Sequence, residues 1–292
     1  MRLAYKHFLY FLLAILLIAG CSSPEENQTK KTFNTSKGSL FIIGGGKRPP
    51  EMIQKMIATA GLSAGDSIVI LPWASSEPDS SSYYAKKQFE AQGFGSFIDL
   101  QPAALDSLSP QARKRVASAP LIYIPGGDQR RFMETAAKYS MDTLLRHAYA
   151  NGSMIAGTSA GAAIMSRPMI TGTALKYEAY HPTFRTLETD NLELDMGIGL
   201  LPDSIIVDQH FVWRSRYNRL LTAVIENPSW TGWGIEESTA VLVQGDTCTV
   251  VGKYQVVLFK NRSKTSRKDA GLLGEEDIQL SILLPGDRFS LY

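Results

Sequence analysis

Residues 154–165 read Met-Ile-Ala-Gly-Thr-Ser-Ala-Gly-Ala-Ala-Ile-Met. A Gly-x-Ser-x-Gly pentapeptide stands between two apolar runs in this stretch, an order that predicts a strand, a sharp turn and a helix. The glycines let the backbone turn so tightly that the Ser159 hydroxyl stands clear of the strand end, where the first N–H groups of the helix point. Ser159 is therefore a candidate nucleophile. The alternative is an ordinary turn of small residues in an α/β domain.

Strands and helices are predicted to alternate over most of the chain. Apolar runs predict strands near residues 40–44, 67–71, 96–100, 121–125, 153–157, 204–209 and 231–236. Helices are predicted near residues 50–60, 80–92, 110–118, 128–150, 160–166 and 214–226. This order predicts an α/β domain with a single doubly wound, mostly parallel sheet that is covered by helices on both faces. Apolar runs at 240–243, 249–251 and 255–259 predict C-terminal antiparallel hairpins, and residues 262–276 are interpreted as a charged loop.

A serine nucleophile needs a base, and the chain contains 4 histidines. His7 lies in the amino-terminal leader, His147 lies in a predicted helix, and His181 lies in a predicted loop. His210 ends the apolar run that starts near residue 204, so it falls at a strand end. Ligands of doubly wound proteins collect at the carboxyl ends of parallel strands, so we expect Ser159 and His210 to meet there.

The acid that orients the imidazole is expected at another strand end. The strand predicted from residue 231 ends in two adjacent carboxylates, Glu236 and Glu237. Side chains alternate along a strand, so only one of the two faces the site. The order serine, histidine, glutamate differs from that of α/β-hydrolases, in which histidine comes last. The chain therefore indicates another lineage of serine hydrolases.

Several motifs together resemble a known family. They are residues 157–161 (Gly-Thr-Ser-Ala-Gly), residues 208–211 (Asp-Gln-His-Phe) with three arginines after them, and residues 234–240 (Gly-Ile-Glu-Glu-Ser-Thr-Ala). Residues 125–129 (Pro-Gly-Gly-Asp-Gln) and 284–288 (Leu-Pro-Gly-Asp-Arg) fit the same pattern. The chain resembles the cyanophycinases of peptidase family S51 over residues 38–292. This resemblance implies a fold like that of class I glutamine amidotransferases, in a family that includes aspartyl dipeptidases.

The resemblance also implies roles for individual residues. It makes Ser159 the nucleophile, His210 the base and Glu237 the acid. Six further residues fall on positions of substrate binding or site support: Gln129, Asp208, Gln209, Arg214, Arg216 and Arg219. The chain departs from the family pattern at Glu236, where aspartate is common, and over residues 173–196, which do not align. The second departure leaves the substrate specificity open.

The three arginines carry a physical argument of their own. Arg214, Arg216 and Arg219 open the predicted helix 214–226, where each cation opposes the helix dipole by roughly 0.3–1 kcal/mol. A purely structural role would favour carboxylates there, so the cluster is interpreted as a site for a substrate carboxylate, which a guanidinium binds with two parallel donors. It suits an acidic residue or a free chain terminus. A solvated charged face is the alternative.

Two glycine-rich turns follow other predicted strands. In residues 125–129 the glycine pair exposes backbone N–H groups at the ligand edge of the sheet, so the N–H groups of Gly127 and Ala160 are candidate oxyanion-hole donors. A tight turn without a catalytic role is the alternative. Residues 44–47 (Gly-Gly-Gly-Lys) lack the spacing of phosphate-binding motifs and are interpreted as a turn near the site.

The amino terminus resembles a bacterial lipoprotein signal peptide over residues 1–20. Arg2 and Lys6 precede a short apolar block that ends in Ile-Ala-Gly-Cys at residues 18–21. The block is too short for a typical membrane-spanning helix. Cleavage before Cys21 would leave a lipidated cysteine, a polar tether over residues 21–37 and a peptidase domain over residues 38–292. The expected location is a bacterial membrane, on its periplasmic side or at the cell surface. An uncleaved anchor helix is the alternative.

Composition excludes several classes of protein. The formal net charge is +2, and the loss of Arg2 and Lys6 with the leader makes it zero, so there is no electrostatic case for nucleic-acid binding. With Cys21 lipidated, Cys248 has no partner for a disulfide. Neither His-x-x-x-His nor Cys-x-x-Cys occurs, so neither a metal nor another cofactor is expected.

The sequence thus predicts a metal-independent serine exopeptidase that acts on aspartyl or β-aspartyl peptide bonds through an acyl-enzyme. Its expected partners are a peptide substrate, with cyanophycin or its fragments as one candidate, and the membrane through the lipid anchor. A homodimer is left open. The alternative function is that of a non-catalytic surface lipoprotein that binds acidic peptides on the same fold.

Overall fold

The computed structural model describes residues 38–102, 108–177 and 184–292. These residues belong to one compact unit that starts at Thr35. The predicted signal peptide, tether and lipidation site at Cys21 lie outside the described residues, as does His181. No helix of the described part is long and apolar enough to span a membrane.

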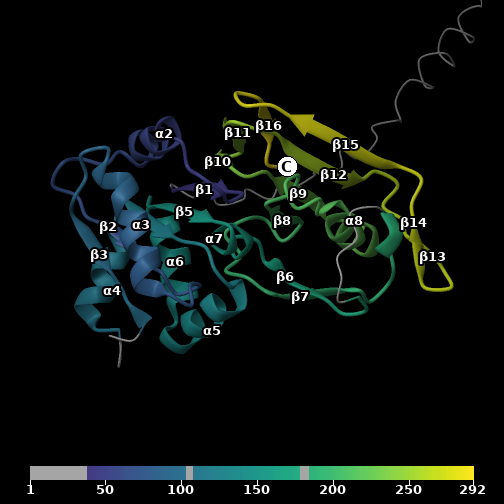
Figure 1. The fold of residues 1–292 in the computed structure, drawn as a ribbon, viewed down its shortest axis with the longest axis horizontal. Coiled ribbons are helices and arrows are strands. Elements are labelled where there is room, and N and C mark those ends of the chain that lie inside the picture. Colours follow the sequence, from purple (N-terminus) through teal and green to yellow (C-terminus); the bar gives the residue numbers. More distant parts are fainter. Residues whose placement is uncertain (1–37, 103–107, 178–183) are drawn as a thin grey trace, which may run out of the picture. The chain divides into compact units, whose positions relative to one another are not determined.

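The first sheet has eight strands in the order β16-β11-β10-β1-β5-β4-β2-β3 (Figure 1). Its parallel half consists of β1 (Ser39–Ile43), β2 (Ile68–Ile70), β3 (Phe97–Asp99), β4 (Leu121–Ile124) and β5 (Met154–Thr158). Its antiparallel half consists of β10 (Thr239–Gln244), β11 (Thr247–Gly252) and β16 (Arg288–Ser290). The predicted parallel sheet and the hairpin β10–β11 are therefore both present, within one mixed sheet.

Helices cover both faces of this sheet because its central strands are apolar on both sides. In β1, Leu40 and Ile42 join one buried cluster, and Phe41 and Ile43 join another. The second cluster contains residues of α2 (Pro50–Ala60) and α3 (Pro78–Glu90). The first contains residues of α4 (Pro110–Ala117), α5 (Gln129–Tyr139), α6 (Met141–Ala150) and α7 (Ala160–Ala163). The single helix predicted over residues 128–150 is wrong: Ser140 has a φ of 52° and separates α5 from α6.

A second, six-stranded sheet has the order β15-β12-β9-β8-β6-β7. Its strands are β6 (Pro168–Ala174), β7 (Leu192–Met196), β8 (Ile205–Gln209), β9 (Thr231–Ile235), β12 (Val256–Asn261) and β15 (Ile278–Leu283). Strands β8 and β9 are parallel, and α8 (Tyr217–Glu226) connects them and packs on β9 and β12 (Figure 1). The larger buried cluster includes residues of both sheets, such as Ile42, Val207 and Trp233. The two sheets therefore share one core.

The prediction of a single sheet is wrong. Strands β8 and β9 are present close to the predicted residues, but they belong to the second sheet, and β12 pairs with β9 instead of extending the β10–β11 hairpin. A buried strand has the same apolar pattern in either sheet, so the sequence pattern does not specify its hydrogen-bonding partner. Strands β6 and β7 were not predicted, because several of their residues are exposed and do not form a buried apolar run. The predicted loop 262–276 contains a hairpin formed by β13 (Arg267–Asp269) and β14 (Leu272–Gly274). A short 3-10 turn, η2 (Phe184–Thr186), precedes β7.

Candidate active site

Ser159 lies between β5 and α7, in the sharp turn that the sequence predicts. Its φ of 55° and ψ of −111° are unusual for a residue with a side chain, and such a conformation costs on the order of 1–3 kcal/mol. The turn needs small neighbours, because a Cβ at Gly157 would lie 2.2 Å from the carbonyl oxygen of Gly161. A strained serine between a strand and a helix is the geometry of a nucleophile elbow.

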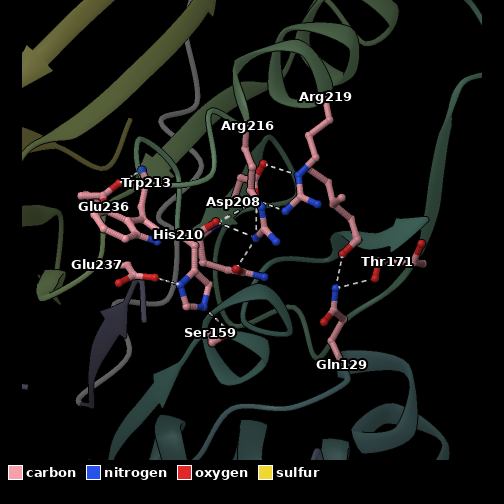
Figure 2. Close-up of polar contacts among 12 residues, drawn as sticks. Gln129, Ser159, Thr171, Asp208, His210, Trp213, Arg216, Arg219, Glu236 and Glu237 are labelled. Atoms are coloured by element: carbon pink, nitrogen blue, oxygen red, sulfur yellow. Dashed lines mark hydrogen bonds and ion pairs between the residues drawn. The ribbon is translucent and has the colours of Figure 1, made fainter. Parts of the chain in front are cut away.

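The structure brings together the three side chains expected to form the centre of the site. His210 Nε2 lies 2.8 Å from Ser159 Oγ, and His210 Nδ1 lies 2.5 Å from Glu237 Oε1 (Figure 2). One tautomer satisfies both contacts: Nδ1–H donates to Glu237, and Nε2 accepts from the Ser159 hydroxyl. Ser159 follows a strand of the eight-stranded sheet, whereas His210 and Glu237 follow strands of the six-stranded sheet.

The surroundings of His210 favour its neutral form. Burial of the ring is the largest influence and lowers the pKa of His210 below its ordinary value of 6.5. The positive charges of Arg214 and Arg216 lower this pKa further, while the hydrogen bond to Glu237 acts in the opposite direction. The imidazole is therefore unprotonated at neutral pH, which is the state that can accept a proton from a hydroxyl.

The two adjacent carboxylates have different partners. Glu236 is 6% exposed, and its Oε2 accepts hydrogen bonds from the backbone N–H groups of Val212 at 2.5 Å and Trp213 at 2.9 Å (Figure 2). Glu237 contacts the imidazole of His210. Glu236 thus holds the turn that follows His210, and Glu237 is the carboxylate that orients the ring. The alternation of side chains along the strand predicts that only one of the two glutamates faces the site, but it does not specify which glutamate that is.

The two candidate oxyanion donors lie on segments that meet at Ser159. A Cβ at Gly126 would lie 3.2 Å from Ser159 Cβ, so the turn that contains Gly127 passes directly beside the serine. Asp128 N–H donates to Ala74 O at 2.8 Å and fixes this turn. In the described part of the chain, the N–H groups of Gly127 and Ala160 form no backbone hydrogen bond outside regular helices and strands. Ala160 is the first residue of α7, where a helix leaves its N–H without an internal partner.

Two of the three arginines predicted to bind a substrate carboxylate, Arg216 and Arg219, pair with the buried carboxylate of Asp208. Arg219 Nε donates to Asp208 Oδ2 at 2.6 Å, and Arg219 Nη2 donates to Asp208 Oδ1 (Figure 2). Arg216 Nη1 donates to the carbonyl oxygen of Gln209 at 2.7 Å and to its Oε1 at 2.5 Å. Asp208 is 1% exposed, and its buried charge needs these partners.

Arg214 differs from the other two arginines. Helix α8 starts at Tyr217, so Arg214 and Arg216 both precede the helix instead of lying in the predicted helix 214–226, but their side chains differ in exposure and partners. It is exposed and has no ion pair within the described ranges. Of the three guanidinium groups, that of Arg214 is the one available to a ligand with all its donors.

Gln129 begins α5 and connects this helix to the second sheet. Its Nε2 donates to the carbonyl oxygens of Ile170 and Thr171, both at 2.7 Å (Figure 2). Both amide hydrogens of this buried side chain are therefore used within the chain. The substrate-binding roles predicted for Gln129, Gln209 and the other residues of that group stay predictions.

A cavity of about 540 Å³ that was not predicted from the sequence lies on the Glu237 side of the site. Its lining includes Lys47, Trp213 and Tyr254, and Trp213 is 76% exposed. The sequence alone does not show whether such an aromatic residue is exposed beside a cavity or buried in the core.

The described residues contain no group of three or more His, Cys, Asp or Glu side chains that could hold a metal ion. Cys248 is buried, and burial raises the pKa of its thiol to about 12, so it is not a nucleophile at neutral pH.

Comparison with known proteins shows the family of this chain. The family model described as "Peptidase family S51" matches residues 40–251. A cyanophycinase of Trichormus variabilis (strain ATCC 29413 / PCC 7937) is 30% identical over 273 residues, which cover 90% of this chain and 88% of that protein. A peptidase E of Pasteurella multocida (strain Pm70) is 26% identical over 152 residues, which cover 49% of this chain and 59% of that protein.

Solved structures show the same fold at lower sequence identity. A peptidase from an acI-B1 Actinobacterium superposes with a TM-score of 0.62 at 21% identity, covering 87% of this chain and 96% of that one. A putative peptidase E protein from Listeria monocytogenes EGD-e gives a TM-score of 0.52 at 18% identity, covering 74% of this chain and 98% of that one.

The fold, the site and these relatives define a hydrolase of the serine peptidase class. The chain belongs to peptidase family S51, and the family resemblance in its sequence motifs is confirmed.

Proposed function

We propose that this protein is a serine exopeptidase that hydrolyses aspartyl or β-aspartyl peptide bonds, with Ser159 as nucleophile, His210 as base and Glu237 as the orienting acid. The observation that supports this most directly is the continuous hydrogen-bonded chain from Ser159 Oγ through the imidazole to Glu237, with contacts of 2.8 and 2.5 Å. A neutral, buried imidazole suits a general base.

In this mechanism, His210 Nε2 takes the proton of the Ser159 hydroxyl while Oγ attacks the scissile carbonyl carbon. The N–H groups of Gly127 and Ala160 stabilise the oxyanion, and Glu237 stabilises the imidazolium. The imidazolium gives its proton to the leaving amine, and the C–N bond breaks. His210 then deprotonates a water molecule that hydrolyses the acyl-enzyme and restores the serine.

Arg214 is the group proposed to recognise the acidic part of the substrate. Its guanidinium is exposed, and its charge is close enough to His210 to lower the pKa of the imidazole. A guanidinium binds a carboxylate with two parallel hydrogen bonds, so it selects an aspartyl side chain or a free carboxylate. Cyanophycin or its fragments are candidate substrates because cyanophycinases are among the relatives.

The test is hydrolysis of cyanophycin and of α-linked and β-linked aspartyl dipeptides by the purified protein, with identification of the products. Ser159→Ala and His210→Ala are each expected to abolish most hydrolysis in a folded protein. Turnover by Ser159→Ala at the wild-type rate would reject the mechanism. Absence of turnover, with peptide binding intact and no labelling by an active-site serine reagent, would support the alternative of a non-catalytic binding lipoprotein.

The membrane anchor is a separate proposal that rests on residues 18–21 of the sequence. Cleavage before Cys21 and lipidation of its thiol would attach the exported domain to a bacterial membrane. Cys21→Ser is expected to block lipidation and leave hydrolysis by the domain unchanged. Mass spectrometry of the mature amino terminus decides it, since an unmodified Cys21 contradicts the proposal.

A further inference from the structure

The side chains of the site come from two different sheets, and one short segment is hydrogen-bonded to both. Residues 44–46 are three consecutive glycines that follow β1 of the eight-stranded sheet. We call this segment the glycine bridge. Ser159 follows β5, which lies in the same sheet as β1, whereas His210 and Glu237 follow β8 and β9 of the six-stranded sheet. The geometry of the site therefore depends on what fixes these two sheets relative to each other at this point.

Three successive carbonyl groups make this connection. Ile43 O accepts from the N–H of Ser159 at 3.0 Å, and Gly44 O accepts from the N–H of His210 at 2.7 Å. Gly45 O accepts from the N–H of Ser238, the residue after Glu237, at 2.9 Å. Three consecutive carbonyl groups thus each hold one segment of the site, and the order of the carbonyl groups along the chain is also the order of the segments that they hold.

The three residues held in this way share an unusual backbone conformation. Ser159, His210 and Ser238 have φ values of 55°, 50° and 54°, although none of them is glycine. Such conformations persist where surrounding contacts enforce them. The hydrogen bonds to Ile43, Gly44 and Gly45 are contacts of this kind: the first holds Ser159, and the two to the glycine bridge hold His210 and Ser238.

The side chains of His210 and Glu237 leave no room for a side chain at Gly45 or Gly46. A Cβ at Gly45 would lie 2.2 Å from Cε1 and 2.5 Å from Nε2 of His210. A Cβ at Gly46 would lie 2.8 Å from both Cβ and Oε2 of Glu237. These distances are far below van der Waals contact, so either substitution has to displace the side chain that it meets.

We propose that Gly45 and Gly46 are positioning residues: the carbonyl group of Gly45, which holds Ser238, and the missing side chains of both glycines set the places of the His210 imidazole and the Glu237 carboxylate relative to Ser159. This inference rests on the proposed Ser159–His210–Glu237 mechanism and adds to it the element that assembles the three groups. It assigns a role to a glycine motif that has no phosphate-binding spacing.

The test is Gly45→Ala, with Gly152→Ala as its matched control. Both glycines have a positive φ of nearly the same size, 115° and 109°, which strains alanine at either position, but a Cβ at Gly152 meets nothing within 4 Å. Gly45→Ala is expected to lower kcat about a hundredfold, since a misplacement on the order of 1 Å costs about that much. KM is expected to change little, and Gly152→Ala is expected to keep the wild-type kcat.

A second pair decides the question if Gly45→Ala does not fold. Gly46 and Gly61 have φ values of 67° and 64°, and a Cβ at Gly61 meets nothing within 4 Å. Gly46→Ala is expected to lower kcat without raising KM, and by less than Gly45→Ala, because its Cβ would lie 2.8 Å from Glu237 whereas a Cβ at Gly45 would lie 2.2 Å from His210. Gly61→Ala is expected to keep the wild-type kcat.

Each outcome separates this inference from the mechanism on which it rests. A wild-type kcat in folded Gly45→Ala or Gly46→Ala overturns the inference, and so does an equal loss in the matched control, because backbone strain would then explain it. If Ser159→Ala is inactive while both bridge variants are fully active, only the positioning role fails. If Ser159→Ala keeps its activity, the mechanism itself fails.

Discussion

The ion pair between Arg219 and Asp208 predicts a large and specific loss of stability. Asp208 is the most deeply buried carboxylate among the site residues, with 1% of its surface exposed, and Arg219 donates to both of its oxygens. Arg219→Ala leaves that charge with Arg216 Nη1 at 3.7 Å as its remaining ion-pair partner. Removing one partner of a buried pair costs about 3–5 kcal/mol. Arg216 offsets part of the loss, so we expect a decrease in the free energy of unfolding of about 3 kcal/mol.

Urea unfolding followed by tryptophan fluorescence measures this decrease, which corresponds to about 6–12 °C in Tm. The matched control is Arg167→Ala, because Arg167 pairs with Asp203 at 3.9 Å through side chains that are 47% and 78% exposed. A solvated pair of this kind contributes less than about 1 kcal/mol. Asp208→Asn in the Arg219→Ala background removes the unpaired charge and should recover part of the stability. Equal urea midpoints for Arg219→Ala and Arg167→Ala would refute the reasoning.

The remaining predictions concern catalysis. Arg214→Ala should change the free energy of unfolding by less than about 0.5 kcal/mol. It should lower kcat/KM on aspartyl substrates about ten- to a hundredfold and on a neutral analogue by less. Equal losses of kcat/KM on the two substrates would contradict carboxylate recognition. Burial holds the pKa of His210 below 6.5, so kcat/KM should stay level as the pH falls through 6.5 and should drop only at lower pH, where the base is protonated. A midpoint above 6.5 in the pH profile of kcat/KM would contradict a lowered pKa of His210. Glu237→Gln should lower kcat more than Glu236→Gln does, whereas Glu236→Gln should lower Tm more than Glu237→Gln does. If kinetics and thermal unfolding give the reverse order, Glu236 is the carboxylate that orients His210 and Glu237 is the one that supports the turn. The Cys248 thiol, with its pKa raised to about 12, should resist iodoacetamide in the native protein, and inhibition by that reagent would indicate a thiol in the chemistry.

The local geometry around Ser159 could be predicted from the sequence because it depends on neighbouring residues. The two glycines of the pentapeptide and the apolar runs beside it specify the strand, the turn and the short helix within a dozen positions. The same holds for the placement of His210 and the glutamate pair at strand ends, and for the helices on both faces of the parallel strands. In each case, the pattern of apolar residues specifies the element by itself.

Contacts between distant segments were decided by the tertiary structure. The apolar run that became β8 would suit either sheet, and only its hydrogen bonds to β6 and β9 place it in the second one. Likewise, the sequence shows Arg216 and Arg219 as free cations at the start of a helix, because nothing near them reveals that Asp208 is buried and needs their charge. The local pattern also left open which glutamate contacts His210, and only the family resemblance indicated Glu237. That contact and the role of residues 44–46 arise when β1, β5, β8 and β9 meet. Hydrogen bonds and ion pairs join residues far apart in the chain, and no local pattern encodes which distant partner a group will find.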